Sequence, residues 1–156
     1  CTVEGMIVVR KDASGELPLI SQGKETSASS YVNENEAPQF AVDGKTDTKW
    51  CATGPAPHDL TIDLGEVMMV SEVYMAHAEK GNVSAGMNTL WYTIETSTDG
   101  TTFEPAIEIK KNAAGETLDT FKPREARYVK VTAIKPTQGA DSAVRIYEIQ
   151  VHGLKK

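Results

Sequence analysis

Apolar and polar residues alternate with a period of two along several short segments of this chain. In "DLTIDLG", residues 59–65, the apolar side chains of Leu60, Ile62 and Leu64 alternate with polar ones, as expected of a β-strand with one buried face. Similar segments occupy residues 70–76, 90–97, 103–109, 127–135 and 144–153. Turn-rich stretches such as "STDGTTF" separate them, and no window carries a helical apolar stripe. The pattern predicts an all-β fold, a sandwich or barrel of about eight strands.

Composition narrows the possible partners. The 156 residues suit one domain that can bury its own core. The net charge of −6 argues against nucleic acid and anionic membranes as partners, because both select basic surfaces. A neutral or cationic ligand is favoured instead. No apolar run approaches the roughly 20 residues that a membrane span needs.

The two cysteines, Cys1 and Cys51, fit no metal-binding spacing, so they either pair with each other or act independently. A chain that starts at Cys1 is either a piece of a longer protein or a mature bacterial lipoprotein acylated at that residue. We expect residues 1–20 to be an extension, a linker or a leading strand, and residues 21–156 to form the domain.

The segment "PQFAVDGKTDTKWCA", residues 38–52, concentrates oxygen-bearing side chains between apolar segments. Asp43 and Gly44 indicate a turn, but a turn alone does not need Asp47 and Thr48 as well. Carboxylate, hydroxyl and carbonyl oxygens are the ligands that hard cations prefer. Because the spacing is not that of a helix-flanked calcium loop, a further ligand must come from elsewhere in the chain.

Glu148 is the candidate for that distant ligand. In the strand "VRIYEIQVHG" it shares a face with Ile146 and is surrounded by apolar neighbours. A carboxylate in such a place is costly unless it is paired or bound to a metal. The alternative is a plain Asp-Gly turn with a buried hydrogen bond to Glu148.

From about Ser21 to Gly153 the chain resembles the coagulation factor five/eight type C (discoidin) domain family, and within it the galactose-binding-like carbohydrate-binding modules of bacterial glycosidases. The resemblance is carried by "TSASSY", "AVDGKTDTKW", "LTIDLG", "YTIETSTDGTTF", "RYVKVTA" and "RIYEIQVHG", in that order. It implies a jelly-roll β-sandwich. The terminal cysteine pair of blood-clotting relatives is absent, because no cysteine lies near Lys156.

The resemblance also implies a structural calcium ion. Its ligands would be the side chains of Asp43, Thr48 and Glu148 and the backbone carbonyls of Phe40, Lys45, Thr48 and Tyr147. Asp47 has no assigned role in this set, and it is interpreted as a solvated turn residue.

Sugar recognition needs an aromatic ring against the apolar face of a pyranose and polar groups that bond its hydroxyls. The loops at residues 31–38, 51–59, 77–90 and 136–143 are candidates for such a site. Sugar-binding relatives often use a histidine, an arginine and an asparagine, which implies here a ligand rim of Tyr31, His77, Asn82 and Asn88. The arginine is not evident, and "KPTQGADSA" offers no aromatic residue.

Other ring-bearing residues are expected to have structural roles. Trp50 is expected in the core and His58 at the start of a strand. Trp91 is either a core residue or an exposed platform. Catalysis is not expected, because Cys51 and His58 share a loop without an evident third partner, and no carboxylate pair lies in a recognisable catalytic frame.

The function implied by the resemblance is a non-catalytic carbohydrate-binding module. It would be a monomeric domain of a larger secreted, surface-anchored or periplasmic bacterial protein, and it would target a glycosidase to a galactose- or hexosamine-type glycan. The alternative is a protein-binding adhesion or assembly module of the discoidin type.

Overall fold

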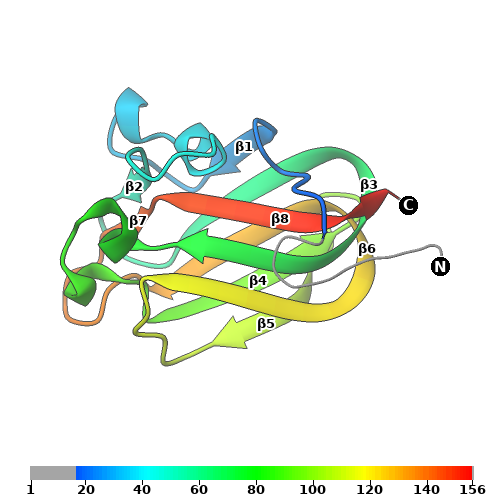
Figure 1. Cartoon of the computed structure of the whole chain (residues 1–156). Helices are drawn as coiled ribbons and strands as arrows, with labels where there is room; N and C mark the ends of the chain where they lie inside the picture. The colour runs from blue at the N-terminus through cyan, green and yellow to red at the C-terminus, as the bar shows by residue number, and fades with distance from the viewer. Residues whose placement is uncertain (1–16, 156) are drawn as a thin grey trace.

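The computed structural model describes residues 17–155 as an antiparallel β-sandwich (Figure 1). In chain order the strands are β1 (Glu25–Ala28), β2 (Trp50–Ala52), β3 (His58–Ala76), β4 (Trp91–Ser97), β5 (Glu104–Ile109), β6 (Glu116–Lys135), β7 (Val144–Ile146) and β8 (Glu148–Lys155). Four short 3-10 helices lie in the connections: η1 (Glu34–Glu36), η2 (Pro38–Ala41), η3 (Ala78–Gly81) and η4 (Ala85–Met87). The prediction of an all-β sandwich with about eight strands is confirmed.

Two long strands, β3 and β6, build both layers of the sandwich. The larger sheet has the order β1-β3-β6-β4-β5, with β8 also paired to β3, while β2 and β7 form a separate pair. The β3 register shifts between Asp63 and Met68, and Gly65 there has a φ of +90°, which only glycine adopts readily. Both long strands curve back in this region (Figure 1). Their first and second halves therefore lie in different layers.

The core fills the space between the layers. Its largest fully buried side chains include Trp50, Tyr92, Leu60, Ile62 and Met75. The Trp50 indole Nε1 donates a hydrogen bond to the Ser30 carbonyl at 2.9 Å, so its one polar atom is satisfied inside the protein. The prediction that Trp50 belongs to the core is confirmed.

The sequence pattern misjudged two strands. Residues 59–65 and 70–76 were expected as separate strands, but both belong to β3. The first half of β6, residues 116–126, was not predicted. It contains Pro123 and exposes Leu118, and it is held by pairing with β3 rather than by its own pattern. Tertiary pairing therefore overrides weak local preference in this segment.

Residues 18–21 run along the free edge of β8. The Ile20 amide donates to the Val151 carbonyl at 2.9 Å, the Gly153 amide donates to the Pro18 carbonyl at 3.1 Å, and the Ser21 hydroxyl accepts from the Val151 amide at 2.8 Å. Residues 18–20, the end of the expected N-terminal extension, thus lie against β8. Cys1, with its expected pairing or acylation, lies outside the described residues.

The described chain has helices of only three or four residues each. None of the helices within residues 17–155 could cross a membrane.

Candidate functional site

The loop after η2 closes over the first residue of β8. The Gly44 amide donates to both carboxylate oxygens of Glu148, each at 3.2 Å, across 104 positions of sequence. Gly44 has a φ of +80°, a conformation that favours glycine at this turn. Glu148 is 1% exposed, and its other hydrogen bond comes from Gln150 Nε2 at 3.3 Å. The loop and the strand thus form one buried polar contact.

The electrostatics around Glu148 favour a cation. The pKa of the Glu148 carboxyl is raised to about 7, chiefly by burial and also by the nearby Asp43 charge, against the lowering effect of hydrogen bonds from Gln150 and the Gly44 amide. Among residues 17–155 no lysine or arginine forms a salt bridge with Glu148. A buried carboxylate without a positive partner is costly. A bound cation would supply the missing charge.

Asp43, Thr48 and Phe40 converge at the same place. One Asp43 carboxylate oxygen accepts from the Thr48 hydroxyl at 2.5 Å, and the other accepts from the Lys45 amide at 3.0 Å. The Thr48 hydroxyl also lies 3.5 Å from the Phe40 carbonyl oxygen. Two carboxylates, a hydroxyl and a carbonyl are therefore neighbours, which is a donor set that suits calcium.

The remaining residues of the predicted calcium set flank this cluster. Lys45 follows Gly44 in the loop, and Tyr147 precedes Glu148. Asp47 lies exposed on the loop. Because no three acidic, histidine or cysteine residues gather anywhere in the described chain, a calcium ion here would depend on hydroxyl and carbonyl oxygens as well as on the two carboxylates. The residues present fit the ion, and calcium binding stays a prediction.

Only two of the four predicted ligand residues are exposed. Tyr31 is 44% exposed in the segment before η1. Asn82 is exposed at the end of η3, in the left-handed conformation with a φ of 67°. These two residues are accessible to a ligand, and their role in binding stays a prediction.

The expectation that His77 belongs to an accessible ligand rim is wrong. Its side chain is fully buried, with Nε2 3.0 Å from the Thr117 hydroxyl and the ring 5.8 Å from the Tyr92 ring centroid. Its backbone amide donates to the Gly115 carbonyl at 2.8 Å, so the segment leading into β6 covers it. Nδ1 has no hydrogen-bond partner within residues 17–155, and burial lowers the His77 pKa to about 4.

Asn88 is also buried rather than part of a ligand rim. Its Oδ1 accepts from the Glu79 amide at 2.9 Å, and its Nδ2 donates to Glu79 Oε1 at 3.2 Å and to the Ala113 carbonyl at 3.1 Å. Gln138 Nε2 donates to the Asn88 carbonyl at 2.8 Å. Asn88 therefore ties three loops together and has no polar side-chain atom left for a sugar.

The structure places an arginine, Arg145, among these loops that the sequence analysis did not single out. Register between β2 and β7 places Arg145 opposite Cys51, whose carbonyl accepts from the Val32 amide at 2.9 Å. The Arg145 guanidinium lies 3.3 Å from Met87 Sδ and 3.4 Å from an Asp141 carboxylate oxygen. It thus lies between the loop of η4 and the loop of residues 136–143, on the strand next to Cys51, to which the segment after Tyr31 is hydrogen-bonded. In the sequence, the one signal for Arg145 was its position between the apolar residues Val144 and Ile146, because neighbouring side chains of a strand point to opposite faces.

The other ring-bearing residues have structural positions. Trp91 is half-buried, donates from Nε1 to Glu108 at 3.1 Å and carries the Lys110 ammonium 5.5 Å from its ring centroid. It lies neither in the core nor on the loops. His58 is buried at the start of β3, with Nε2 within 3.2 Å of two backbone carbonyls, as predicted.

Fold and site together define a β-sandwich module whose loops gather at one end, with one loop locked onto the last strand. Residues 25–149 match the F5/8 type C domain, and the chain belongs to this family. No curated protein sequence matches it.

Bacterial carbohydrate-binding modules are among the solved structures that match this fold. The family 32 module of EndoD from Streptococcus pneumoniae has 21% identity and a TM-score of 0.78, covering 87% of this chain and 99% of its own. Chitosan-binding module 1 of a chitosanase/glucanase from Paenibacillus sp. IK-5 has 26% identity and a TM-score of 0.75, with the same coverage of 87% and 99%. Module 2 of that enzyme, in complex with chitotriose, has 25% identity and a TM-score of 0.73, covering 86% and 99%.

Proposed function

We propose that this chain is a non-catalytic carbohydrate-binding module of a secreted or surface-anchored bacterial protein, and that it holds an attached glycosidase on glycan. The observation that carries the proposal is the position of Arg145 between the loop of η4 and the loop of residues 136–143, with the exposed ring of Tyr31 on the segment that is hydrogen-bonded to the neighbouring strand β2. A planar guanidinium bonds paired sugar hydroxyls, and an aromatic ring covers the apolar face of a pyranose.

Amino sugars suit this face as well as neutral ones. The related module 2 from Paenibacillus was solved with chitotriose, and the present chain carries a net charge of −6, which attracts a cationic glycan more than an anionic one. The ligand class that we propose is therefore a galactose- or hexosamine-type glycan. Few large apolar side chains of residues 17–155 are exposed, namely Tyr31, Val32, Leu118 and Leu154, which gives little support to a broad protein-binding patch.

We also propose that the module binds one structural calcium ion. The ion would be held by the side chains of Asp43, Thr48 and Glu148 together with carbonyls of Phe40, Lys45, Thr48 and Tyr147. It would neutralise the two carboxylates and fix the loop of Gly44 to β8. It would not contact the glycan in this proposal.

A glycan array with calcium present tests the ligand class, and Arg145→Ala tests the site. Shallow sugar sites bury little area, so a dissociation constant on the order of millimolar is expected for a monosaccharide. Arg145→Ala should weaken binding at least about tenfold. Thermal stability should change little, because the partly exposed pair of Arg145 with Asp141 contributes little.

Arg127→Ala is the matched control for this measurement. Its guanidinium pairs with Asp63 at 2.8 Å on another face of the protein, so glycan affinity should stay at the wild-type value. Equal affinity of the Arg145 variant and wild type would show that the ligand face is wrongly placed. A wild-type protein that binds no glycan across a broad array would favour the protein-binding alternative.

Anionic vesicles should not bind the module. The net charge is −6, and the exposed segment before and within η1 carries Glu34 and Glu36 without a basic residue, so an approach to a phosphatidylserine surface is repelled. Sedimentation with phosphatidylserine vesicles at physiological salt measures this directly. Appreciable pelleting of the protein would contradict the expectation.

A further inference from the structure

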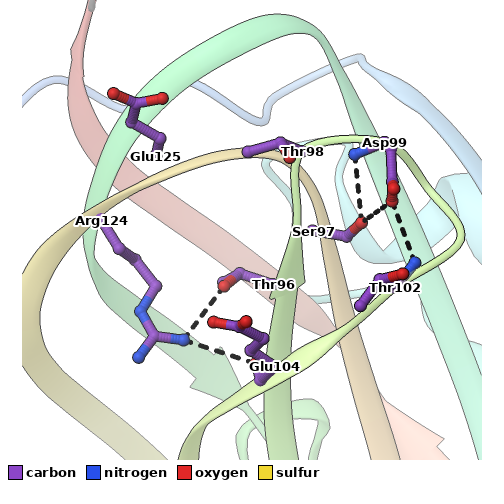
Figure 2. A pocket seen from close by; sticks show the side chains of 8 residues that line it. All are labelled: Thr96, Ser97, Thr98, Asp99, Thr102, Glu104, Arg124 and Glu125. Carbon is purple, nitrogen blue, oxygen red and sulfur yellow. Dashed lines mark hydrogen bonds between the residues drawn. The ribbon is translucent and has the colours of Figure 1, made fainter.

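A polar hollow lies at the end of the sandwich away from the proposed glycan face. It has a volume of about 310 Å³ and is lined by Thr96, Ser97, Thr98, Asp99, Thr102, Glu104, Arg124 and Glu125 (Figure 2). These residues come from the end of β4, the turn that follows it, the start of β5 and the bend of β6. The loops of η3 and η4 precede the opposite end of β4. All eight lining side chains carry a hydroxyl, a carboxylate or a guanidinium group.

One wall of the hollow is a preformed turn. Asp99 Oδ1 accepts hydrogen bonds from the Thr101 amide at 2.8 Å, from the Thr102 amide at 2.9 Å and from the Ser97 hydroxyl at 2.9 Å. The Ser97 oxygen in turn accepts from the Gly100 amide at 2.8 Å. These bonds fix the backbone of the turn through the Thr102 amide. The Thr102 hydroxyl forms no hydrogen bond with residues 17–155.

Arg124 forms the other wall and is held on one side only. Its Nη1 donates to the Pro105 carbonyl at 3.0 Å, to the Thr96 hydroxyl at 3.1 Å and to the Glu104 carbonyl at 3.4 Å. The Phe121 ring centroid lies 5.8 Å from its Cζ. Nε and Nη2 have no acceptor in the described part of the chain. A fixed guanidinium with unused donors is organised for a ligand that offers paired acceptors.

The charges around the hollow decide what that ligand is. Asp99, Glu104 and Glu125 line the hollow together with Arg124. The carboxylates of Asp99 and Glu104 alone outnumber the one guanidinium, so a phosphate, sulfate or carboxylate would be repelled on balance. Vicinal hydroxyls of a sugar both donate and accept, and they match guanidinium donors beside carboxylate acceptors.

We propose that this hollow is a second saccharide-binding site, which takes one neutral or amino-sugar residue and is independent of the loop face around Arg145. Its volume of about 310 Å³ lies at the small end of the range for ligand sites, roughly 300–1,000 Å³. Without an aromatic residue in the lining, recognition depends on hydroxyl bonding alone. Two sites at opposite ends of one module allow it to bridge two glycan chains, which raises its effective strength on a dense surface.

The test is a titration of the isotope-labelled chain with galactose, N-acetylgalactosamine and glucosamine, followed through its backbone amide resonances. Saturable shifts are expected for amides of residues 97–104 with at least one of these sugars. Arg124→Gln should weaken that response at least tenfold and leave any response of the loops near Arg145 unchanged. Thr102→Val should also weaken the response of residues 97–104. This variant keeps the backbone amide that holds the turn, so it tests the site even if the Arg124 variant folds poorly.

Arg127→Gln is the matched control, because Arg127 lies near Arg124 on β6 but pairs with Asp63 outside the hollow. Shifts at the loops without any at residues 97–104 would overturn the second site only. Shifts at residues 97–104 without any at the loops would support it and overturn the proposed loop face. Equal loss in the Arg124 and Arg127 variants, or shifts at residues 97–104 produced by sulfate or calcium in place of sugar, would overturn the saccharide assignment.

Discussion

Calcium at about 100 times its dissociation constant should raise the free energy of unfolding by about 2.7 kcal/mol, which corresponds to roughly 8 °C in melting temperature for a domain of this size. The reason is that the proposed ligands come from a loop and a strand 104 positions apart in sequence, which unfolding separates. Glu148→Gln should abolish this rise. In chelator the variant should melt at or above the wild-type temperature, because it removes a buried carboxylate that lacks a positive partner. Thermal melts with and without calcium measure both effects.

Asp43→Ala and Asp47→Ala form the matched pair for this experiment. Asp43 bonds Thr48 and lies next to the Gly44 contact with Glu148, so its removal should lower the melting temperature and abolish the calcium response. Asp47 is exposed on the same loop, and its removal should do neither. A metal-stripped wild type whose melt is unmoved by calcium would mean that the loop is only a turn.

Acidification from pH 7 toward pH 4 should destabilise the protein by about 3 kcal/mol through His77 alone. Its pKa is lowered from 6.5 to about 4 by burial, so the unfolded state binds the proton more readily between these values. The contribution of neutral His77 is therefore fully present above pH 6.5 and is lost as the pH falls toward 4. The groups facing the ring are uncharged Thr117 and Tyr92, and Asp119 is one step further away, bonded to the Tyr92 hydroxyl at 2.6 Å.

Urea unfolding of wild type and His77→Gln at several pH values isolates this effect. The difference in unfolding free energy between the two proteins should change by about 3 kcal/mol between pH 7 and pH 4, because contributions common to both cancel. Glu148 is one such contribution, and it acts in the opposite direction. Its pKa is raised from 4.5 to about 7, so the stability that its protonated form provides is present below pH 4.5 and is lost as the pH rises through 7. His152→Gln serves as the control, since His152 is only partly buried, and a pH-independent difference for His77→Gln would contradict the prediction.

The pattern of alternating residues determined much of the architecture. Strands β4 and β8, the first half of β3 and the second half of β6 each show the alternation of one buried and one solvated face, and this signal is local in sequence. The contact between the Asp43 loop and Glu148 was also predicted. A carboxylate in an apolar strand is costly unless it gains a partner, and an oxygen-rich turn needs a further oxygen ligand to hold a cation. Neither partner is available locally in sequence, so each feature indicated the other.

Only the tertiary structure decided which loop residues are accessible. His77 and Asn88 occur in a polar loop with Asn82, yet the segment of residues 111–117 covers the first two and leaves Asn82 exposed. Arg145 reaches the proposed ligand face because β7 pairs with β2, and Arg124 reaches the hollow because β6 bends beside the start of β5. Strand register and loop coverage depend on contacts between segments far apart in the chain. The composition of a single loop does not reveal these long-range contacts. The sequence could therefore indicate the residue types of a site but not which residues line it.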